Sequence, residues 1–191
     1  MLRKTIKNIA LLDLQNFTAE ALREIKKIES CAMLLIPKIA SDEWKNAYAK
    51  ITIRNVASII EVSYSKYSVL NGMVILNDKN VSDDCLYIVN GIVILETVEK
   101  IPDLCVNGLL LKRKKSRYEM TRMNGRSVEV DDNVVIKPYP NTIEIDGDTV
   151  RSFDYNTLVA AGNNVDIVDD VTEQMLSDKK ITFAAGNEVK C

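Results

Sequence analysis

Histidine is absent from the 191-residue sequence. Its absence excludes serine–histidine and cysteine–histidine nucleophilic pairs, histidine-ligated metal sites and histidine acid–base catalysis. Neither a glycine-rich phosphate-binding loop nor a dinucleotide-binding fingerprint is present either. The sequence therefore predicts a protein that is not an enzyme and that has no catalytic, cofactor-binding or metal-binding residue.

Aromatic residues and long apolar runs are also scarce. Aromatic side chains make up 6% of the chain and include one tryptophan, which leaves few platforms for stacking nucleic-acid bases. The formal net charge of −2 gives no general attraction to nucleic acid. No apolar run approaches the roughly 18 residues that a membrane-spanning helix needs. We expect neither a nucleic-acid partner nor a membrane span.

Cysteine is present four times but never in a CxxC motif or a disulfide-framework spacing, at Cys31, Cys85, Cys105 and Cys191. Three of the four lie within or beside apolar stretches that are typical of strands. Buried free thiols of this kind are common in the reducing cytoplasm. We also recognise no signal peptide at the start of the chain, so the expected location is cytoplasmic.

The most informative feature is a repeat. The stretch LYIVNGIVIL at residues 86–95 returns in nearly the same form as DLCVNGLLLK at residues 103–112. Asn-Gly pairs recur at steps of 19, 17 and 17 residues, beginning at Asn71, Asn90, Asn107 and Asn124. A period of about 20 residues with one strand in each unit is typical of a solenoid, in which each turn of the coil forms one rung. Type I′ hairpin turns are the alternative, but here Asn-Gly lies directly against the following strand.

Asparagine continues this column beyond the Asn-Gly pairs, and Cys31 occupies the same column between Asn8 and Asn55. Equivalent positions of successive rungs lie about 4.8 Å apart. An inward-pointing asparagine amide can bond the backbone of the corner and the asparagine of the next rung, and a following glycine relieves the backbone. The predicted structural ladder comprises Asn8, Asn55, Asn71, Asn90, Asn107, Asn124, Asn141, Asn163 and Asn187.

Three rungs are longer than the others because each contains a predicted helix. Thr18, Ser41 and Thr172 each precede acidic residues in the pattern of a helix N-cap. After the first cap, Leu22, Ile25 and Ile28 form the apolar stripe expected of one helix. A right-handed crossover is expected between the parallel strands on either side of such a helix.

The predicted fold is a β-rich α/β solenoid of about ten parallel-strand rungs with an asparagine ladder, in one domain covering residues 1–191. Helix-bearing rungs occupy residues 1–55, plain β rungs occupy residues 56–160, and a helix-bearing rung with a terminal strand occupies residues 161–191. This architecture resembles the leucine-rich-repeat class in its period, its strand-plus-helix unit and its asparagine ladder. The middle, with shorter rungs, is more similar to parallel β-solenoids such as the polymerising bactofilins.

The two faces of the strands differ along the chain. In the later rungs, the second and fourth residues after the ladder position are apolar and the first and third are polar, so even positions are predicted to point inward. In the first six rungs the odd positions are apolar as well, and two such columns form a surface large enough to bind a partner. A covering segment of the same chain is the alternative, but no segment looks long and apolar enough. The predicted interface with a second copy of the chain comprises Leu11, Leu34, Ile36, Ile60, Val74, Leu76, Val93, Leu95 and Leu110.

Two other functions remain as alternatives. Residues 112–126 carry seven cations and one acid, and this segment could bind an anionic surface. Glu144 and Asp166 occupy equivalent odd positions of adjacent rungs, where a glycan-acting enzyme could use paired carboxylates on the outer sheet face. Asp146 and Asp148 could meet a hard cation, but they lack the remaining oxygen ligands of a calcium loop. Solvated acidic residues are the commoner explanation for such a face.

Overall fold

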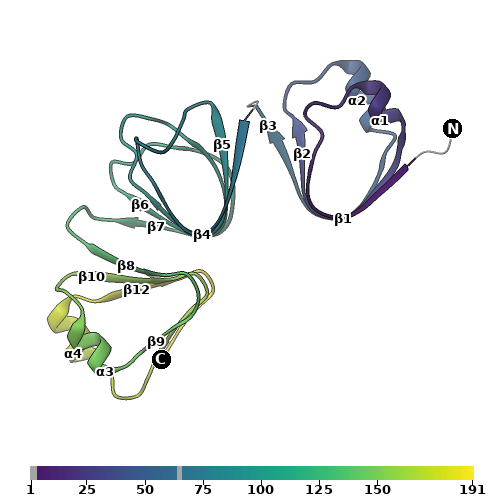
Figure 1. Cartoon of the computed structure of the whole chain (residues 1–191). Helices are drawn as coiled ribbons and strands as arrows, with labels where there is room; N and C mark the ends of the chain where they lie inside the picture. Colours follow the sequence, from purple (N-terminus) through teal and green to yellow (C-terminus); the bar gives the residue numbers. More distant parts are fainter. Residues whose placement is uncertain (1–3, 64–65) are drawn as a thin grey trace. The chain divides into compact units, whose positions relative to one another are not determined.

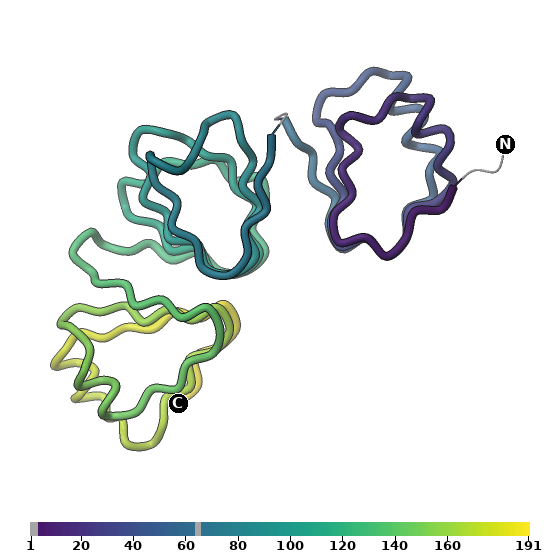
Figure 2. Tube along the Cα trace, in the orientation of Figure 1, coloured from purple at the N-terminus to yellow at the C-terminus, as the bar shows by residue number. Residues whose placement is uncertain are grey.

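The computed structural model describes residues 4–63 and 66–191. The chain divides into two compact units, Met1–Ser65 and Lys66–Cys191, which we describe separately (Figures 1 and 2). Both units are rich in β-strand, and every strand pair within the described residues is parallel. The expected β-rich, parallel-stranded architecture with few helices is therefore present.

Unit 1 contains a three-stranded parallel sheet in the order β1-β2-β3, with one helix in each connection. Figure 1 shows α1 and α2 beside each other on the same side of this coil. The elements are β1 (Lys4–Asp13), α1 (Ala19–Arg23), β2 (Ile25–Pro37), α2 (Asp42–Tyr48) and β3 (Thr52–Val62).

The two helix starts in unit 1 agree with the prediction. The hydroxyl oxygens of Thr18 and Ser41 accept hydrogen bonds from the third backbone N–H that follows, each over 3.2 Å. The predicted continuation of the first helix is wrong, because α1 ends at Arg23 and Ile25 begins β2. Ile25 and Ile28 are β-branched and fit a strand better than a helix, and both are buried in the core of unit 1.

The corner of unit 1 consists of three residues with left-handed backbone conformation. Asn8, Ser30 and Asn55 have φ values of 58°, 55° and 51°. Strand register aligns Ile9 with Cys31 and Val56, so the column passes through Ser30. The predicted placement of Cys31 in the ladder is thus wrong by one residue, and its side chain lies in the core at 2% exposure. Asparagine suits this column because it tolerates the left-handed conformation better than most residues.

Unit 2 begins with four long strands in the order β4-β5-β6-β7. The Asn-Gly pairs of all four strands align in register, as the repeat predicts. The strands are β4 (Lys66–Leu76), β5 (Cys85–Leu95), β6 (Asp103–Arg113) and β7 (Glu119–Val130).

The asparagine side chains of this column form a short ladder. The Asn90 amide nitrogen donates to the side-chain oxygen of Asn71 over 2.9 Å, and the Asn107 amide donates to Asn90 over 2.8 Å. Asn71 and Asn90 are exposed, so the predicted inward orientation is wrong. The alternation of the strand explains this, because Val89 and Val93 take the inward positions and place Asn90 on the opposite face.

The glycines of the column lie so close together that no side chain would fit between them. A Cβ atom on Gly91, Gly108 or Gly125 would overlap the carbonyl oxygen of the glycine one rung earlier. Their φ values of 135°, 136° and 138° also disfavour any L side chain. Gly72 shares the positive φ, at 83°, but a Cβ there would meet no atom within 4 Å.

The rest of unit 2 forms three further rungs with two sheets, β12-β10-β8 and β13-β11-β9. Figure 1 shows α3 and α4 together on one side of this coil. The elements are β8 (Val135–Tyr139), β9 (Ile143–Ile145), α3 (Gly147–Ser152), β10 (Thr157–Ala161), β11 (Asn164–Ile167), α4 (Glu173–Lys179), β12 (Thr182–Ala185) and β13 (Glu188–Lys190).

The corners of these three rungs also align. The backbone N–H of Asn163 donates to the carbonyl of Asn141 over 3.3 Å, and that of Asn187 donates to Asn163 over 2.9 Å. The even positions of these rungs face the core as predicted, whereas the last of them, Cys191, is exposed. The inward residues are Ile143, Ile145, Val165, Ile167 and Val189.

Of the two helix starts in unit 2, one was predicted from the sequence and the other was not. Thr172 caps α4, and its hydroxyl oxygen accepts from the Met175 N–H over 3.3 Å. Helix α3 was not expected, because residues 56–160 were predicted as plain β rungs. Its N-cap is Asp146, a preferred capping residue whose carboxylate accepts from the Thr149 N–H over 2.7 Å.

The left-handed corner of unit 1 predicts a stabilising substitution. Ser30→Asn places in this column the residue that occupies it at Asn8 and Asn55, so we expect the free energy of unfolding to rise by about 0.5–1 kcal/mol. Thermal denaturation of the whole chain measures this. Ala32→Asn is the control, because this exposed position has no positive φ and should show no gain; an equal gain in both variants would contradict the argument.

The glycine column predicts two unequal alanine substitutions. Gly91→Ala forces Cβ into the carbonyl of Gly72 and should destabilise the chain by about 3 kcal/mol or more. Gly72→Ala meets only backbone strain and should cost about 1–2 kcal/mol. Urea denaturation of both variants compares them, and equal losses would show that the carbonyl contact is unimportant.

Candidate protein-interaction surface

The residues predicted to form an interface lie mostly inside the coils. Val93, Leu95 and Leu110 are 0% exposed and line the core enclosed by β4–β7. Leu76 is buried in the same core and Val74 packs against it, while Leu34 and Ile36 belong to the core of unit 1. Of the other two, Leu11 is half-buried and Ile60 is 2% exposed. The prediction that these side chains form one outer surface is therefore wrong for seven of the nine, whereas Leu11 and Ile60 belong to no core cluster within the described residues of unit 1.

The cause of this error is a one-residue difference between corners. Glycine follows asparagine at Asn90-Gly91 but precedes it at Gly162-Asn163. Residues at odd distances from asparagine therefore face inward in β5 and outward in β11. Because side chains alternate strictly between faces, a shift of one residue exchanges the two faces of a whole strand.

The opposite face of β5 and β6 is also apolar, and the same chain covers it. Ile92, Ile94, Leu109 and Leu111 on these strands form a second core. They pack there against Leu158 and Ala160 of β10 and Ala184 of β12, all at most 7% exposed. Short alanine side chains let the two sheets approach closely. The repeated stretch VNGIVIL is thus apolar on both faces because both are buried within unit 2, which is the alternative that the sequence disfavoured.

Strand β4 continues these outer columns, and no other strand of unit 2 covers it. Register places Val69, Met73 and Ile75 beside Ile88, Ile92 and Ile94 of β5. The three β4 side chains are 42%, 44% and 45% exposed, whereas their β5 neighbours are at most 5% exposed. We call Val69, Met73 and Ile75 the β4 face. It gathers three of the large exposed apolar side chains of unit 2 on one strand.

Within unit 2, the edge strand β4 also differs from the edge strands β7, β8, β9 and β13, although the short edge strand β12 is uncharged as well. After Lys66, no residue of β4 is charged. At the other side of the same sheet, β7 carries charges at Glu119, Arg122, Arg126 and Glu129, and the edge strand β8 contains Lys137 and Pro138. Charged residues and proline on edge strands prevent pairing with other chains, so β4 lacks the usual protection.

The basic segment of residues 112–126 is largely neutralised by the following rung. Lys112 pairs with Glu129 at 3.3 Å, Lys114 with Asp131 at 2.5 Å and Lys115 with Asp132 at 3.9 Å. Hydrogen bonds to these acids raise the pKa of Lys112 and Lys114. Each acid lies 17 residues after its lysine, at the same place one rung later.

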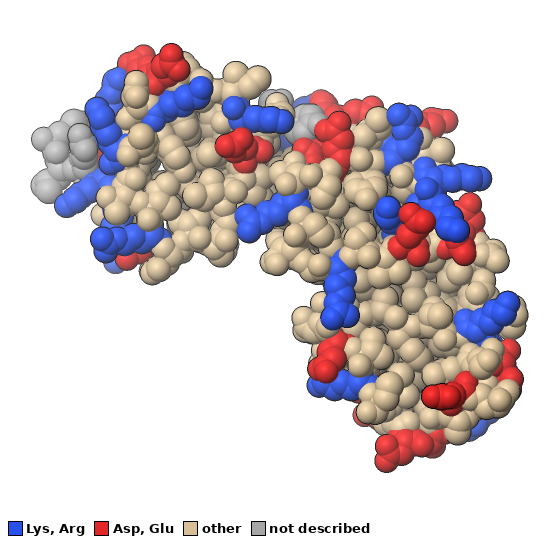
Figure 3. Space-filling model, turned by 180° about the vertical axis from the view of Figure 1, so that it is seen from behind, with Lys and Arg blue, Asp and Glu red and all other residues tan. Residues whose placement is uncertain are grey.

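Figure 3 shows the same intermixing of charge at a larger scale, with positive and negative side chains interspersed on the face in view. Arg113 also has a local partner, Glu96 at 3.7 Å. These pairs weaken the alternative of an anion-binding segment, because all three of its lysines already face acids.

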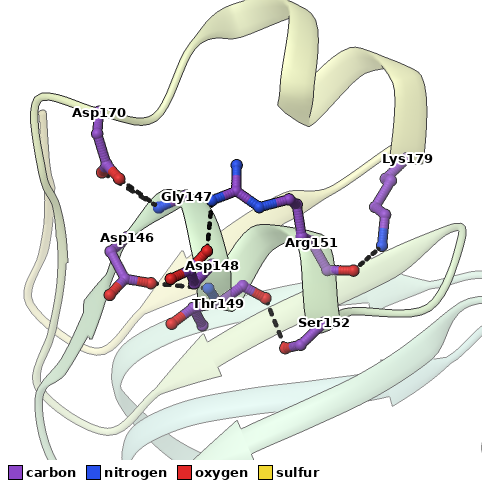
Figure 4. A network of polar contacts seen from close by, with 8 residues as sticks. All are labelled: Asp146, Gly147, Asp148, Thr149, Arg151, Ser152, Asp170 and Lys179. Carbon is purple, nitrogen blue, oxygen red and sulfur yellow. Dashed lines mark hydrogen bonds and ion pairs between the residues drawn. The ribbon is translucent and has the colours of Figure 1, made fainter.

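The acidic residues near α3 are engaged in a local network, which Figure 4 shows. Asp146 caps α3, the Asp170 carboxylate accepts from the Gly147 N–H over 3.0 Å, and Asp148 pairs with Arg151. Hydrogen bonds from Thr149 hold the pKa of Asp146 below its usual range. Asp146 and Asp148 therefore serve the helix start, and no cluster of three or more metal-ligating side chains occurs in residues 4–63 and 66–191.

Glu144 and Asp166 lie side by side in register on β9 and β11, as their repeat positions predict. Asp166 faces Lys190 on its other side, and one of its carboxylate oxygens is buried without a hydrogen-bond partner. A cavity of about 320 Å³ lies elsewhere in unit 2, between apolar Val128, Val130, Val134 and Leu158. Lys114, Glu129, Asp131 and Thr182 complete its lining. The carboxylate pair and the cavity thus do not combine into one site.

Comparisons with known proteins identify no relative of this chain. No family model, no curated protein and no solved structure matches this chain. Within the part of the chain that the structure describes, no helix is both long and apolar enough to cross a membrane. The β4 face is therefore characterised by its own residues alone. Sequence reasoning missed it because Val69, Met73 and Ile75 lie at even distances from Asn71, which were taken to point inward.

Burial on both faces predicts that truncations on either side of β6 are equally damaging. Leu109→Ala and Leu110→Ala point in opposite directions, yet each should destabilise the chain by about 2–5 kcal/mol because each opens a cavity in a core. Met73→Ala on the β4 face should cost far less. Chemical denaturation of the three variants measures this, and a small loss at Leu109 would mean that β10 and β12 do not cover the outer face.

Proposed function

We propose that this chain is a non-catalytic repeat protein that associates with a second copy of itself through strand β4. The observation that carries the proposal is the half-exposed β4 face, formed by Val69, Met73 and Ile75, on an edge strand without charges beyond Lys66. Exposed apolar side chains gathered on one surface mark interaction sites. An unprotected strand edge adds backbone donors and acceptors to that surface.

The comparison between the two edges of the same sheet supports this assignment. The outer column that begins at Met73 continues through Ile92 and Leu109 and ends at Arg126 of β7. The column through Val69 ends in the same way at Arg122. Two of the three columns are thus apolar at β4 and charged at β7, whereas the column through Ile75 ends at Val128, and the two charged ends favour β4 over β7 as the edge that meets a partner.

A second copy is the simplest partner for this edge. Two identical strands related by a two-fold axis run antiparallel and present the same residues to each other, so the surface complements itself. Such pairing extends the sheet across both copies and lets the two β4 faces share one apolar surface. It also satisfies the backbone groups at the edge without any further partner.

We also propose that both units are built from one solenoid repeat. Three rungs in unit 1, four in β4–β7 and three in the remainder of unit 2 fit ten copies of one solenoid repeat with asparagine at its corners. Repeat proteins of this kind, such as the leucine-rich-repeat and β-solenoid classes that the sequence resembles, are built for binding. Four unpaired cysteines, three of them buried, support a cytoplasmic location.

Measurement of mass in solution tests the proposed association. Native mass spectrometry and light scattering of the whole chain should detect a dimer at micromolar concentration. Met73→Glu combined with Ile75→Lys should yield a folded monomer, because charged side chains would replace the apolar cross-strand contacts between the two copies. Circular dichroism and the melting temperature establish that the variant remains folded.

Val135→Lys is the matched control for these substitutions. It also places a charge at a partly exposed apolar residue of an edge strand, with 37% exposure, but on β8. This variant should remain dimeric. A wild-type chain that is monomeric at high micromolar concentration would refute self-association, and a dimer that survives the β4 substitutions would place the interface elsewhere.

A further inference from the structure

The four Asn-Gly pairs of the column can undergo a chemical reaction that does not depend on self-association. An asparagine that is followed by glycine can lose its side-chain nitrogen as ammonia. Glycine has no Cβ to hinder the attack of its backbone nitrogen on the asparagine side chain. The four pairs begin at Asn71, Asn90, Asn107 and Asn124 and lie in register. They share one sequence motif but differ in their surroundings, so the structure can rank their reactivity.

The reaction needs no enzyme and no reagent other than water. The backbone nitrogen of the glycine, after losing its proton to solvent base, attacks the side-chain carbonyl carbon of the asparagine. A new C–N bond closes a five-membered succinimide ring, and the side-chain nitrogen leaves as ammonia. Water then opens the ring at either carbonyl, which gives aspartate or isoaspartate.

The leaving nitrogen is restrained in two of the pairs. The side-chain nitrogens of Asn90 and Asn107 donate hydrogen bonds to the preceding asparagine in the ladder, over 2.9 and 2.8 Å. Asn71 lies on the first strand of unit 2, so within this unit its amide donates to no earlier asparagine of the column. Its side chain accepts the bond from Asn90, and a donor at this oxygen stabilises the negative charge that develops there during attack.

The attacking glycine also has the most open surroundings at the first pair. Gly91, Gly108 and Gly125 each pack directly against the carbonyl of the preceding glycine. Gly72 has no atom within 4 Å of its Cβ position, and β4 pairs with β5 on one side only. Asn124 lies on the opposite edge strand and is exposed too, but Gly125 is packed against Gly108. Asn71-Gly72 is the pair that combines a leaving group without a hydrogen bond inside unit 2, a carbonyl that accepts from Asn90 and a glycine with open space around it.

We infer that Asn71 is a site of spontaneous deamidation in the folded protein, and that the Asn-Gly pairs at 90, 107 and 124 are protected by the stack. Aspartate at position 71 keeps an oxygen that accepts from Asn90, so this product preserves the ladder. Isoaspartate inserts an extra backbone carbon before Gly72 and displaces the strand that follows.

Peptide mapping of the whole chain tests the inference. The protein is held at 37 °C in mildly alkaline buffer, at a concentration low enough to keep it monomeric. It is then digested and analysed by mass spectrometry with electron-transfer fragmentation, which distinguishes aspartate from isoaspartate at each site. We expect Asn71 to react about tenfold faster than the other three, a barrier difference of about 1.4 kcal/mol.

The urea-unfolded chain is the internal control, because there the four pairs should react at similar rates. Gly72→Ala should abolish most of the reaction at Asn71; its methyl group meets no atom within 4 Å, and the backbone strain at positive φ is the only cost. Asn71→Asp should melt close to the wild-type temperature. Equal rates at the four sites in the folded chain, a faster reaction at another pair, or no reaction at Asn71 would each overturn the inference.

Discussion

The contact on which the structure depends is the stacking of one rung's corner on the next. In β4–β7, the carbonyl oxygen of each glycine fills the space that a Cβ atom would need on the following glycine, from Gly91 to Gly125. The later rungs repeat this arrangement, with Gly162 against Pro140 and Gly186 against Gly162. Unit 1 solves the same problem with asparagine and serine in the left-handed conformation. In each case the chain turns sharply while adjacent backbones remain in contact.

Strict register follows from these stacked corners and determines most other contacts. Most strand residues lie beside their equivalent one rung away, about 4.8 Å distant, and register shifts occur only at Lys4/Thr5 and Leu104/Cys105 in the described strand pairs. This explains why ion pairs such as Lys112–Glu129 join residues 17 positions apart, and why apolar residues form continuous columns through Ile92 and Leu109. Function in such an architecture is concentrated where a column ends, because only there do side chains lack a neighbour.

Sequence reasoning succeeded where the signal is local. The Asn-Gly period gave the register of β4–β7, and the hydroxyl caps Thr18, Ser41 and Thr172 marked three helix starts. The failures at Cys31 and at the β5 and β6 faces share one cause, since a corner can shift by a single residue without changing the repeat and the shift exchanges the faces. The covering of Ile92 by β10 and β12 was not predictable for a different reason. Packing between two sheets produces no repeat in the sequence, and the short stretch LVAA at residues 158–161 contains none.

The unlike ends of the columns also determine what kind of assembly β4 permits. Head-to-tail stacking would place β7 of one copy on β4 of the next. The columns would then bring Arg126 against Met73 and Arg122 against Val69, and only Val128 would meet Ile75 as an apolar pair. Those charges would lose water without gaining partners on β4, where no acid follows Lys66. Pairing of β4 with β4 instead joins apolar ends and leaves both β7 edges in water. The charge on β7 therefore favours a closed pair over an open filament, because the same residues that keep one edge in solvent forbid the contact that would let the stack continue.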